Sequence, residues 1–398
     1  MTFHDDLARH FAGARDRFPG LKRVAVHALA LVCFELAARP MVAQPMTVLF
    51  GTHVAGPGKG FSAAAFDAKT GALGKPELVA EADAPAYFIV ADGGRRLYTC
   101  NSTGFVSAYS VADGGRSLTL LNKVSSEGGD PNYISLDTAG KYVFVANYAG
   151  ASIVAWALRP DGSIGARTAF VQFTGSGANS SRQQRAYAHS TVVDPANRFV
   201  LTGDLGLDKL FVHRFNSLDG SLVPNDPAFA SVAPGLGARL VLFHPNGKWV
   251  YLNTEMGSSI VFFRWESATG TLAQQQAVST LSPEFHGSSA ASDIRIGADG
   301  RFLYATNRVN GGGDGDLAVF AIDAKSGQLA PIQHVSSGGR IPRNFEIDPT
   351  GQWMIVANQE SNNAQVLRID RKSGMLTPVG APVSVPYPFS PRFVAVAR

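Results

Sequence analysis

Histidine, arginine and glutamate side chains recur along this chain at intervals that a repeat could bring together. His189 titrates near neutrality and could act as a general base towards water. Arg239 and Arg308 could hold a carboxylate or stabilise an oxyanion, because a guanidinium is a planar fork of donors. Glu255 could orient an arginine or be the acid–base group itself, and a neighbouring arginine would favour the orienting role. These types suit proton transfer next to a stabilised anion, with either His189 or Glu255 as the base.

A 17-residue unit that occurs six times without a gap must position these residues. Each copy has a Pro or Ala, an apolar stretch, a turn, an apolar strand and usually an Asn, as in PNYISLDTAGKYVFVAN from Pro131. The turn residue is glycine in five copies and Asn197 in the third, and asparagine also adopts the left-handed backbone. Apolar and polar residues alternate on both sides of the turn. The unit therefore predicts two strands joined by a hairpin.

A second turn, Gly, any residue, then Leu or Ile, follows strands rich in β-branched and aromatic residues and occurs seven times, as in Gly270-Thr271-Leu272. Each period then holds four strands, the content of one propeller blade. The first copy, from Thr47, lacks an inner strand, whereas the chain ends in SPRFVAVAR, which matches one. We predict an all-β fold over residues 47–398: a seven-bladed β-propeller with four-stranded blades, the first completed by the C-terminal strand, which removes open edges.

The register of the repeat predicts one polar mouth. The residue eight before each turn starts an innermost strand, and the residue eight after it follows the second strand, so rotation should bring both sets to one end of the central channel. The residues that we expect to be catalytic are His189, Arg239, Glu255 and Arg308. Those that we expect to bind substrate are Asn132, Tyr148, Asp204, Arg343, Gln359 and Arg392, the last in the closing strand.

Other possible sites carry weaker signals. Asp204 and Asp208 bracket a glycine loop and could bind a metal, but Asp204 stands where other copies have Asn and more simply fixes the turn. The segment NGGGDGD at 310–316 resembles a calcium loop in composition only and is better read as a hairpin. His53, His244, His286 and His334 lack the spacing of metal ligands and suggest packing or surface roles. We expect neither a metal nor a cofactor.

Composition excludes several classes of protein. The chain of 398 residues is 45% apolar, which excludes disorder as its main state. A net charge of +4 without a clustered basic stripe argues against nucleic-acid binding, although a modest positive field would favour a small anionic ligand. Two cysteines provide no disulfide framework, and the sequence does not indicate an oligomeric state.

Residues 1–46 differ from the rest and suggest a leader or signal segment. The apolar run VAVHALALVCFELAA at 24–38 follows Lys22-Arg23 and precedes small residues, as in a secretory signal. It is too short and too polar for a membrane span. Cleavage would place the protein in the periplasm or outside the cell. An N-terminal helix or a disordered leader on a cytoplasmic protein is the alternative.

The repeat and its motifs resemble the lactonase family with a seven-bladed propeller, which includes bacterial 6-phosphogluconolactonases and fungal muconate cycloisomerase-type enzymes. The resemblance covers nearly all of 47–398. It is carried in order by the motifs Ala146-Asn147-Tyr148, Ala188-His189-Ser190, Asp204-Leu205-Gly206-Leu207-Asp208, Gly237-Ala238-Arg239, Asn253-Thr254-Glu255, Thr306-Asn307-Arg308, Pro342-Arg343-Asn344-Phe345 and Ala357-Asn358-Gln359. The family usually has a histidine where this chain has Leu240, and often another where it has Tyr187.

The resemblance implies roles for these residues. The family's proposed active-site residues match His189, Arg239, Glu255 and Arg308. It implies metal-independent acid–base hydrolysis of a sugar-derived lactone, the partner being a small anionic or polyhydroxylated lactone. A cycloisomerase or lyase acting on a carboxylate lactone is an alternative, because it needs the same proton transfers. A non-catalytic binding scaffold is another, since propeller folds do not fix function.

Overall fold

The computed structural model describes residues 46–56 and 58–395. The predicted signal at 24–38 lies outside the described residues. Within them, no helix is both long and apolar enough to cross a membrane.

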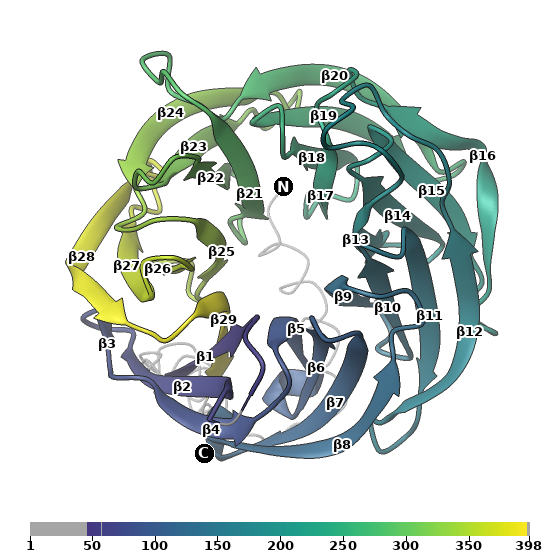
Figure 1. Cartoon of the computed structure of the whole chain (residues 1–398). Coiled ribbons are helices and arrows are strands. Elements are labelled where there is room, and N and C mark those ends of the chain that lie inside the picture. The colour runs from purple at the N-terminus through teal and green to yellow at the C-terminus, as the bar shows by residue number, and fades with distance from the viewer. Residues whose placement is uncertain (1–45, 57, 396–398) are drawn as a thin grey trace, which may run out of the picture. The chain divides into compact units, whose positions relative to one another are not determined.

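Seven antiparallel sheets are arranged in a ring around a common centre (Figure 1). We number them as blades from the N-terminus. Blade 1 comprises β29 (Pro388–Ala395), β1 (Met46–Thr52), β2 (Gly60–Asp67) and a divided outer strand, β3 (Ala72–Leu73) and β4 (Glu77–Glu81). Blade 2 comprises β5 (Pro85–Ala91), β6 (Arg96–Asn101), β7 (Phe105–Ala112) and β8 (Ser117–Ser125), with short 3₁₀ turns η1 (Asp92–Gly94) and η2 (Asp113–Gly115).

The other five blades each run from the inner to the outer strand in chain order. Blade 3 comprises β9 (Pro131–Leu136), β10 (Tyr142–Asn147), β11 (Ser152–Leu158) and β12 (Ile164–Gln172). Blade 4 comprises β13 (Ala188–Val193), β14 (Phe199–Asp204), β15 (Lys209–Phe215) and β16 (Leu222–Ser231). Blade 5 comprises β17 (Ala238–Phe243), β18 (Trp249–Thr254), β19 (Ser259–Glu266) and β20 (Thr271–Ser279). Blade 6 comprises β21 (Ser289–Ile296), β22 (Phe302–Val309), β23 (Asp316–Ile322) and β24 (Leu329–Ser336). Blade 7 comprises β25 (Pro342–Ile347), β26 (Trp353–Asn358), β27 (Asn363–Ile369) and β28 (Leu376–Ser384).

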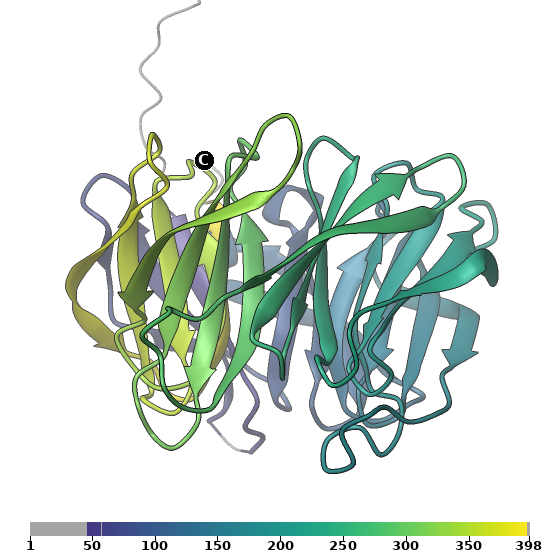
Figure 2. The same ribbon diagram turned by 90° about the horizontal axis from the view of Figure 1, so that it is seen from above.

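The inner strands line the channel and contact one another in a closed ring, because β29 contacts both β25 and β5. Figure 2 shows the blades from the side, with their strands running between the two faces of the ring. The C-terminal strand β29 pairs with β1 from Met46 opposite Ala395 to Thr52 opposite Pro388. The predicted propeller, its four-stranded blades and the completion of the first blade by the C-terminal strand are confirmed.

The repeated asparagine at the end of the second strand joins neighbouring blades. Asn147 donates from Nδ2 to the carbonyl of Ser126 at 2.9 Å, and Asn358 donates in the same way to Ser337 at 2.8 Å. In both cases the acceptor follows the outer strand of the preceding blade. The side chain satisfies a carbonyl that would otherwise be buried without a partner, and it fixes the backbone just before the next residue reaches the mouth.

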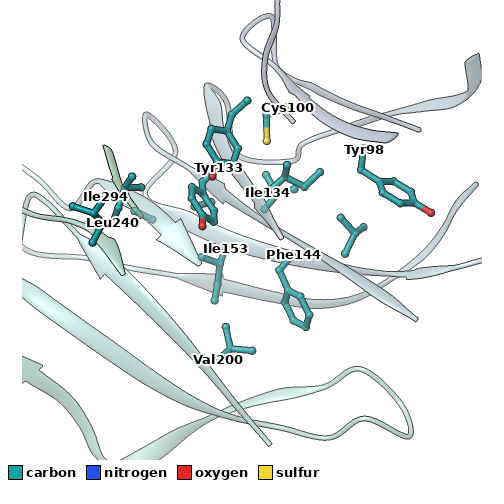
Figure 3. Packing of buried hydrophobic residues seen from close by; sticks show 14 of the residues in the cluster. Tyr98, Cys100, Tyr133, Ile134, Phe144, Ile153, Val200, Leu240 and Ile294 are labelled. Atoms are coloured by element: carbon teal, nitrogen blue, oxygen red, sulfur yellow. The ribbon is translucent and has the colours of Figure 1, made fainter. Parts of the chain in front are cut away.

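Apolar side chains between the blades form the core (Figure 3). The largest cluster includes Tyr133, Ile134 and Phe144 of blade 3 with Val200 of blade 4, all buried. Each such side chain contributes about 1.5–3 kcal/mol on burial. Cys100 is buried in the same cluster as a free thiol.

Each second-turn glycine fits tightly against the preceding blade. Gly327 has a φ of 81°, and a Cβ there would lie 2.7 Å from Trp249 of blade 5. Glycine is therefore required both for the turn and for close blade packing.

Candidate active site

A buried carboxylate, Glu255, lies at the centre of the predicted mouth. Its Oε2 accepts from Arg239 Nε at 2.9 Å and pairs with Arg308 Nη2 at 3.0 Å. The Nε2 atom of His189 lies 4.0 Å from the same oxygen. The structure thus brings together all four residues that were expected to be catalytic, from blades 4, 5 and 6.

β-Bulges at the beginnings of two inner strands position His189 and Arg239. The strand register shifts between Ala188 and Ser190, and again between Ala238 and Val241. His189 and Arg239 lie within these shifts. A bulge bends a strand locally and redirects a side chain, so each of these residues can leave the regular pleat. Glu255 follows directly after β18, and Arg308 lies near the end of β22.

Burial and charge fix the protonation of this group. Burial alone would raise the pKa of Glu255, but the charges of Arg308 and Arg239 outweigh it and hold that pKa well below its ordinary value. Burial, reinforced by the charge of Arg239, holds the pKa of His189 well below its ordinary value. Near neutral pH the site therefore contains an ionised glutamate and an uncharged histidine. This state favours the orienting role for Glu255.

A third arginine approaches Glu255 from a segment that the sequence did not single out. Arg182 Nη2 lies 2.7 Å from Glu255 Oε1, and this arginine side chain is 46% exposed. Its segment, 173–187, joins blade 3 to blade 4 and is fixed to the mouth by Gln183, which donates to the carbonyl of Leu205 at 2.8 Å. The one available signal was the interval between turns Gly140 and Asn197, the longest of the series.

Two stacked tyrosines line the mouth beside His189. The ring centroids of Tyr148 and Tyr187 are 4.7 Å apart, and Tyr148 meets the His189 ring edge-on at 5.5 Å. Tyr148 was expected at the mouth. Burial raises the pKa of its hydroxyl, which remains protonated and can donate a hydrogen bond.

The opposite part of the mouth contains Arg343, Gln359 and His53, a residue that the sequence suggested for packing or the surface. Gln359 Nε2 lies 3.2 Å from His53 Nδ1 and 3.1 Å from Nε2. His53 directly follows β1, so it occupies the position in blade 1 that Gln359 occupies in blade 7. The expectation of a packing or surface role missed this equivalence, which the Thr52–His53 register could have revealed.

The predicted place of Arg392 at the mouth is wrong. Pro388, not Pro391, occupies the position in β29 that Pro342 occupies in β25, so Phe389 is the equivalent of Arg343. Arg392 lies three residues further along the inner strand. There it pairs with Glu346 at 3.1 Å.

Two other predicted ligand contacts differ in accessibility. Asp204 is fully buried and accepts from the backbone N–H groups of Tyr187 and Leu207, both at 3.0 Å. It fixes the turn, and its buried Oδ2 has no hydrogen-bond partner among the described residues, so its role in substrate binding stays a prediction. Asn132 is the second residue of β9, the inner strand of blade 3, and its buried Oδ1 has no hydrogen-bond partner among the described residues. Those residues also include no cluster of three His, Cys, Asp or Glu side chains that could hold a metal ion.

Comparison with known proteins gives consistent matches over the propeller. The sequence model of the family "Lactonase, 7-bladed beta-propeller" matches residues 47–394. A 6-phosphogluconolactonase of Bacillus subtilis is 31% identical over 347 residues, covering 86% of this chain and 97% of that protein. A 6-phosphogluconolactonase of Formosa agariphila is 32% identical, covering 80% and 91%. The structure of a periplasmic gluconolactonase of Pseudomonas aeruginosa superposes with a TM-score of 0.82 at 30% identity, covering 89% of this chain and all of that one.

Proposed function

We propose, since the chain belongs to the seven-bladed β-propeller lactonase family, that it hydrolyses a sugar-derived lactone. The observation that carries the site assignment is Glu255, buried and held by Arg239 and Arg308 beside an uncharged His189. A binding scaffold has no need for arginines gathered on a buried carboxylate with a neutral histidine beside them.

His189 is the proposed general base. Its Nε2 is too far from Glu255 for a hydrogen bond, and its buried Nδ1 has no partner among the described residues. The ring is therefore free to accept a proton. It removes that proton from a water molecule while the water oxygen forms a bond to the lactone carbonyl carbon. A positioned base of this kind contributes about 10²- to 10⁴-fold to the rate.

Arg239 and Arg308 are the proposed oxyanion donors. The carbonyl oxygen becomes negative as water attacks, and donors already oriented by Glu255 need no rearrangement to stabilise it. A well-placed donor contributes about 3–4 kcal/mol to such a transition state. The ring C–O bond then breaks, and the protonated His189 returns its proton to the leaving alkoxide. The product is an open-chain hydroxy acid.

Glu255 is the proposed anchor of the arginines rather than the base. Both of its oxygens already accept from arginines, Oε2 from Arg239 and Arg308 and Oε1 from Arg182, so a proton would have to displace these ion pairs. We propose that no metal ion takes part, because side chains alone supply the base and the oxyanion donors.

Turnover of a small lactone panel tests this function. The wild type should open at least one of glucono-δ-lactone, its 6-phosphate and a muconolactone, with acid release followed in a pH-stat and with a chelator present. His189→Ala should lower kcat/KM about 100-fold or more. His213→Ala is the matched control, because His213 is also buried but belongs to β15, the third strand of its blade.

Three results would contradict parts of the proposal. Equal turnover by the wild type and by His189→Ala, with near-native circular dichroism, would remove His189 as the base. Loss of wild-type activity when the chelator is present would show that a metal ion is needed. Absence of turnover on every lactone would remove the function itself.

A further inference from the structure

The cations at the mouth are unequally supplied with counter-charge. Arg239, Arg308 and Arg182 all pair with Glu255. Arg343 makes no ion pair within the described residues, and its buried Nε has no hydrogen-bond partner there. Burial raises the pKa of Asp130 and the charge of Arg343 partly opposes this, but the two side chains form no ion pair within the described residues. Within the described residues, Glu255 thus pairs with three of the four arginines at the mouth. The fourth, Arg343, is a partly buried cation without an ion-pair partner, which is costly.

Arg343 is held in place by an aromatic ring instead of a carboxylate. Its guanidinium carbon lies 5.0 Å from the ring centroid of Phe389, the equivalent residue of the next blade. Contact with a ring face fixes the plane of the guanidinium and leaves its edge donors available. Burial, with the charges of Arg308 and Arg239, lowers the pKa of Arg343 to about 9. An anion at this position would offset the cost of burying the positive charge of Arg343, which is the main cause of its lowered pKa.

Polar groups from blades 7 and 1 accompany Arg343. Gln359 lies just after β26. Its backbone N–H donates to the carbonyl of Ile341 at 2.9 Å, and this bond fixes Gln359 beside the first residues of β25. Its side-chain amide contacts the His53 ring. The His53 ring in turn lies 5.8 Å from that of Phe389. Arg343, Gln359 and His53 therefore form one cluster across the junction of blades 7 and 1.

This cluster lies on other blades than the reacting groups. His189, Arg239, Glu255 and Arg308 come from blades 4 to 6, and none of them makes a hydrogen bond or ion pair with His53, Gln359 or Arg343 in the described part of the chain. The charge of Arg343 nevertheless helps to lower the pKa of Glu255 and that of His189, so Arg343 is close enough to serve the same substrate.

We propose that Arg343, Gln359 and His53 form a subsite for the anionic group of the substrate, a phosphate or a carboxylate remote from the lactone carbonyl. The proposal rests on the lactonase function. It makes these three residues determinants of specificity for charged over neutral lactones, while the groups around Glu255 carry out the chemistry on either.

A comparison of charged and neutral lactones tests the subsite. Arg343→Gln should lower kcat/KM about 10- to 100-fold for the anionic lactone that the wild type prefers, because it removes a hydrogen bond to a charged group. The same variant should change kcat/KM for neutral glucono-δ-lactone less than about threefold. Glucono-δ-lactone 6-phosphate and a muconolactone are the two anionic probes, so the selective loss identifies the anion as phosphate or carboxylate. Arg264→Gln, an exposed arginine of β19, is the control and should behave as the wild type.

Two further variants make the test independent of folding effects. Arg343→Lys keeps the charge and should retain more activity on the anionic lactone than Arg343→Gln does. The paired change of His53 and Gln359 to leucine should weaken the same discrimination, by about three- to tenfold. Equal losses on neutral and anionic lactones in all variants would overturn the subsite.

Direct binding separates failure of the subsite from failure of the function. If the wild type opens no lactone, titration calorimetry with 6-phosphogluconate and gluconate still decides. Tighter binding of the phosphorylated acid by the wild type, lost in Arg343→Gln, supports the subsite. Equal affinities of the wild type and Arg343→Gln for both acids would overturn it.

Discussion

Two charged clusters share the central channel, and they differ in how their charges balance. At the mouth, Arg182, Arg239 and Arg308 converge on Glu255, and Arg343 has no carboxylate of its own. Three residues further along the inner strands, Arg295 pairs with Asp293 at 3.3 Å, and Glu346 lies 3.1 Å from Arg392 and 3.9 Å from Arg295. In this deeper cluster two arginines meet two carboxylates.

The pKa values of arginines shift in opposite directions in the two clusters. Burial would lower the pKa of Arg295, but Asp293, Tyr87 and Glu346 outweigh it and raise that pKa well above its ordinary value. Arg343 has no such compensation, and its pKa falls to about 9. The balanced cluster can serve as structure alone, whereas the mouth has cations in excess of its own carboxylate. The difference separates charges that hold the ring together from charges left for a ligand.

Removing one carboxylate from each cluster gives the largest expected contrast. Glu255→Gln should lower kcat/KM about 100-fold or more on any lactone that the enzyme opens, because Arg239 and Arg308 lose the charge that orients them. Steady-state kinetics measures the loss.

Glu346→Gln should affect stability instead. It leaves Arg392 without its partner, and the partly exposed carboxylate limits the expected loss to about 1–3 kcal/mol of unfolding free energy. Activity at 25 °C should change less than about threefold. Urea denaturation and kinetics on the same preparation measure both. Comparable losses of activity in the two variants would abolish the distinction between the clusters.

Arg182 tests how far the mouth cluster extends. Arg182→Gln should lower kcat/KM about three- to tenfold, because the Arg182 side chain is half exposed and two other arginines still hold Glu255. Arg185→Gln, a change in the same segment, is the matched control, since Arg185 contacts the Tyr187 ring rather than Glu255. An effect as large as that of Glu255→Gln would make Arg182 part of the reacting group.

The smallest expected effect is that of mild acid on the neutral lactone. The pKa of His189 in the folded protein lies well below 6.5, so the base stays uncharged as the pH falls from 8 to 6.5. After correction for spontaneous hydrolysis, kcat/KM should change less than about twofold over this range and decline only below it. The unfolded chain binds this proton at about 6.5, so the contribution of His189 to stability is present above that pH and is lost as the pH falls. A midpoint of the activity profile at or above 6.5 would contradict the assignment.

The repeat explains why so much of this arrangement could be predicted. Strand alternation and turn glycines recur in every blade, and rotation about one axis converts equal register into proximity. The sequence alone could therefore place four residues at one mouth: His189, Arg239, Glu255 and Arg308. Arg182 could not, because its segment has no counterpart in the other blades and periodicity says nothing about an insertion.

Arg392 shows the limit of matching motifs without strand pairing. Pro391-Arg392 imitates Pro342-Arg343, but Pro388 is the residue that opens the strand. The closing strand has both prolines, and only its pairing with β1 decides between them. The same error of register in blade 1 left His53 out of the predicted mouth. The partners of His53 across the junction are Gln359 and Phe389.

The junction of β29 with β1 joins the two ends of the propeller sequence within a single blade. His53 follows one of these strands and Phe389 belongs to the other, so the cluster of Arg343, Gln359 and His53 is complete only when synthesis has reached the last strand and the ring has closed. An incomplete chain would thus hold the reacting groups of blades 4 to 6 without the residues of the proposed subsite. An anion bound in that subsite would in turn link the first and last strands of the propeller and stabilise the closed ring.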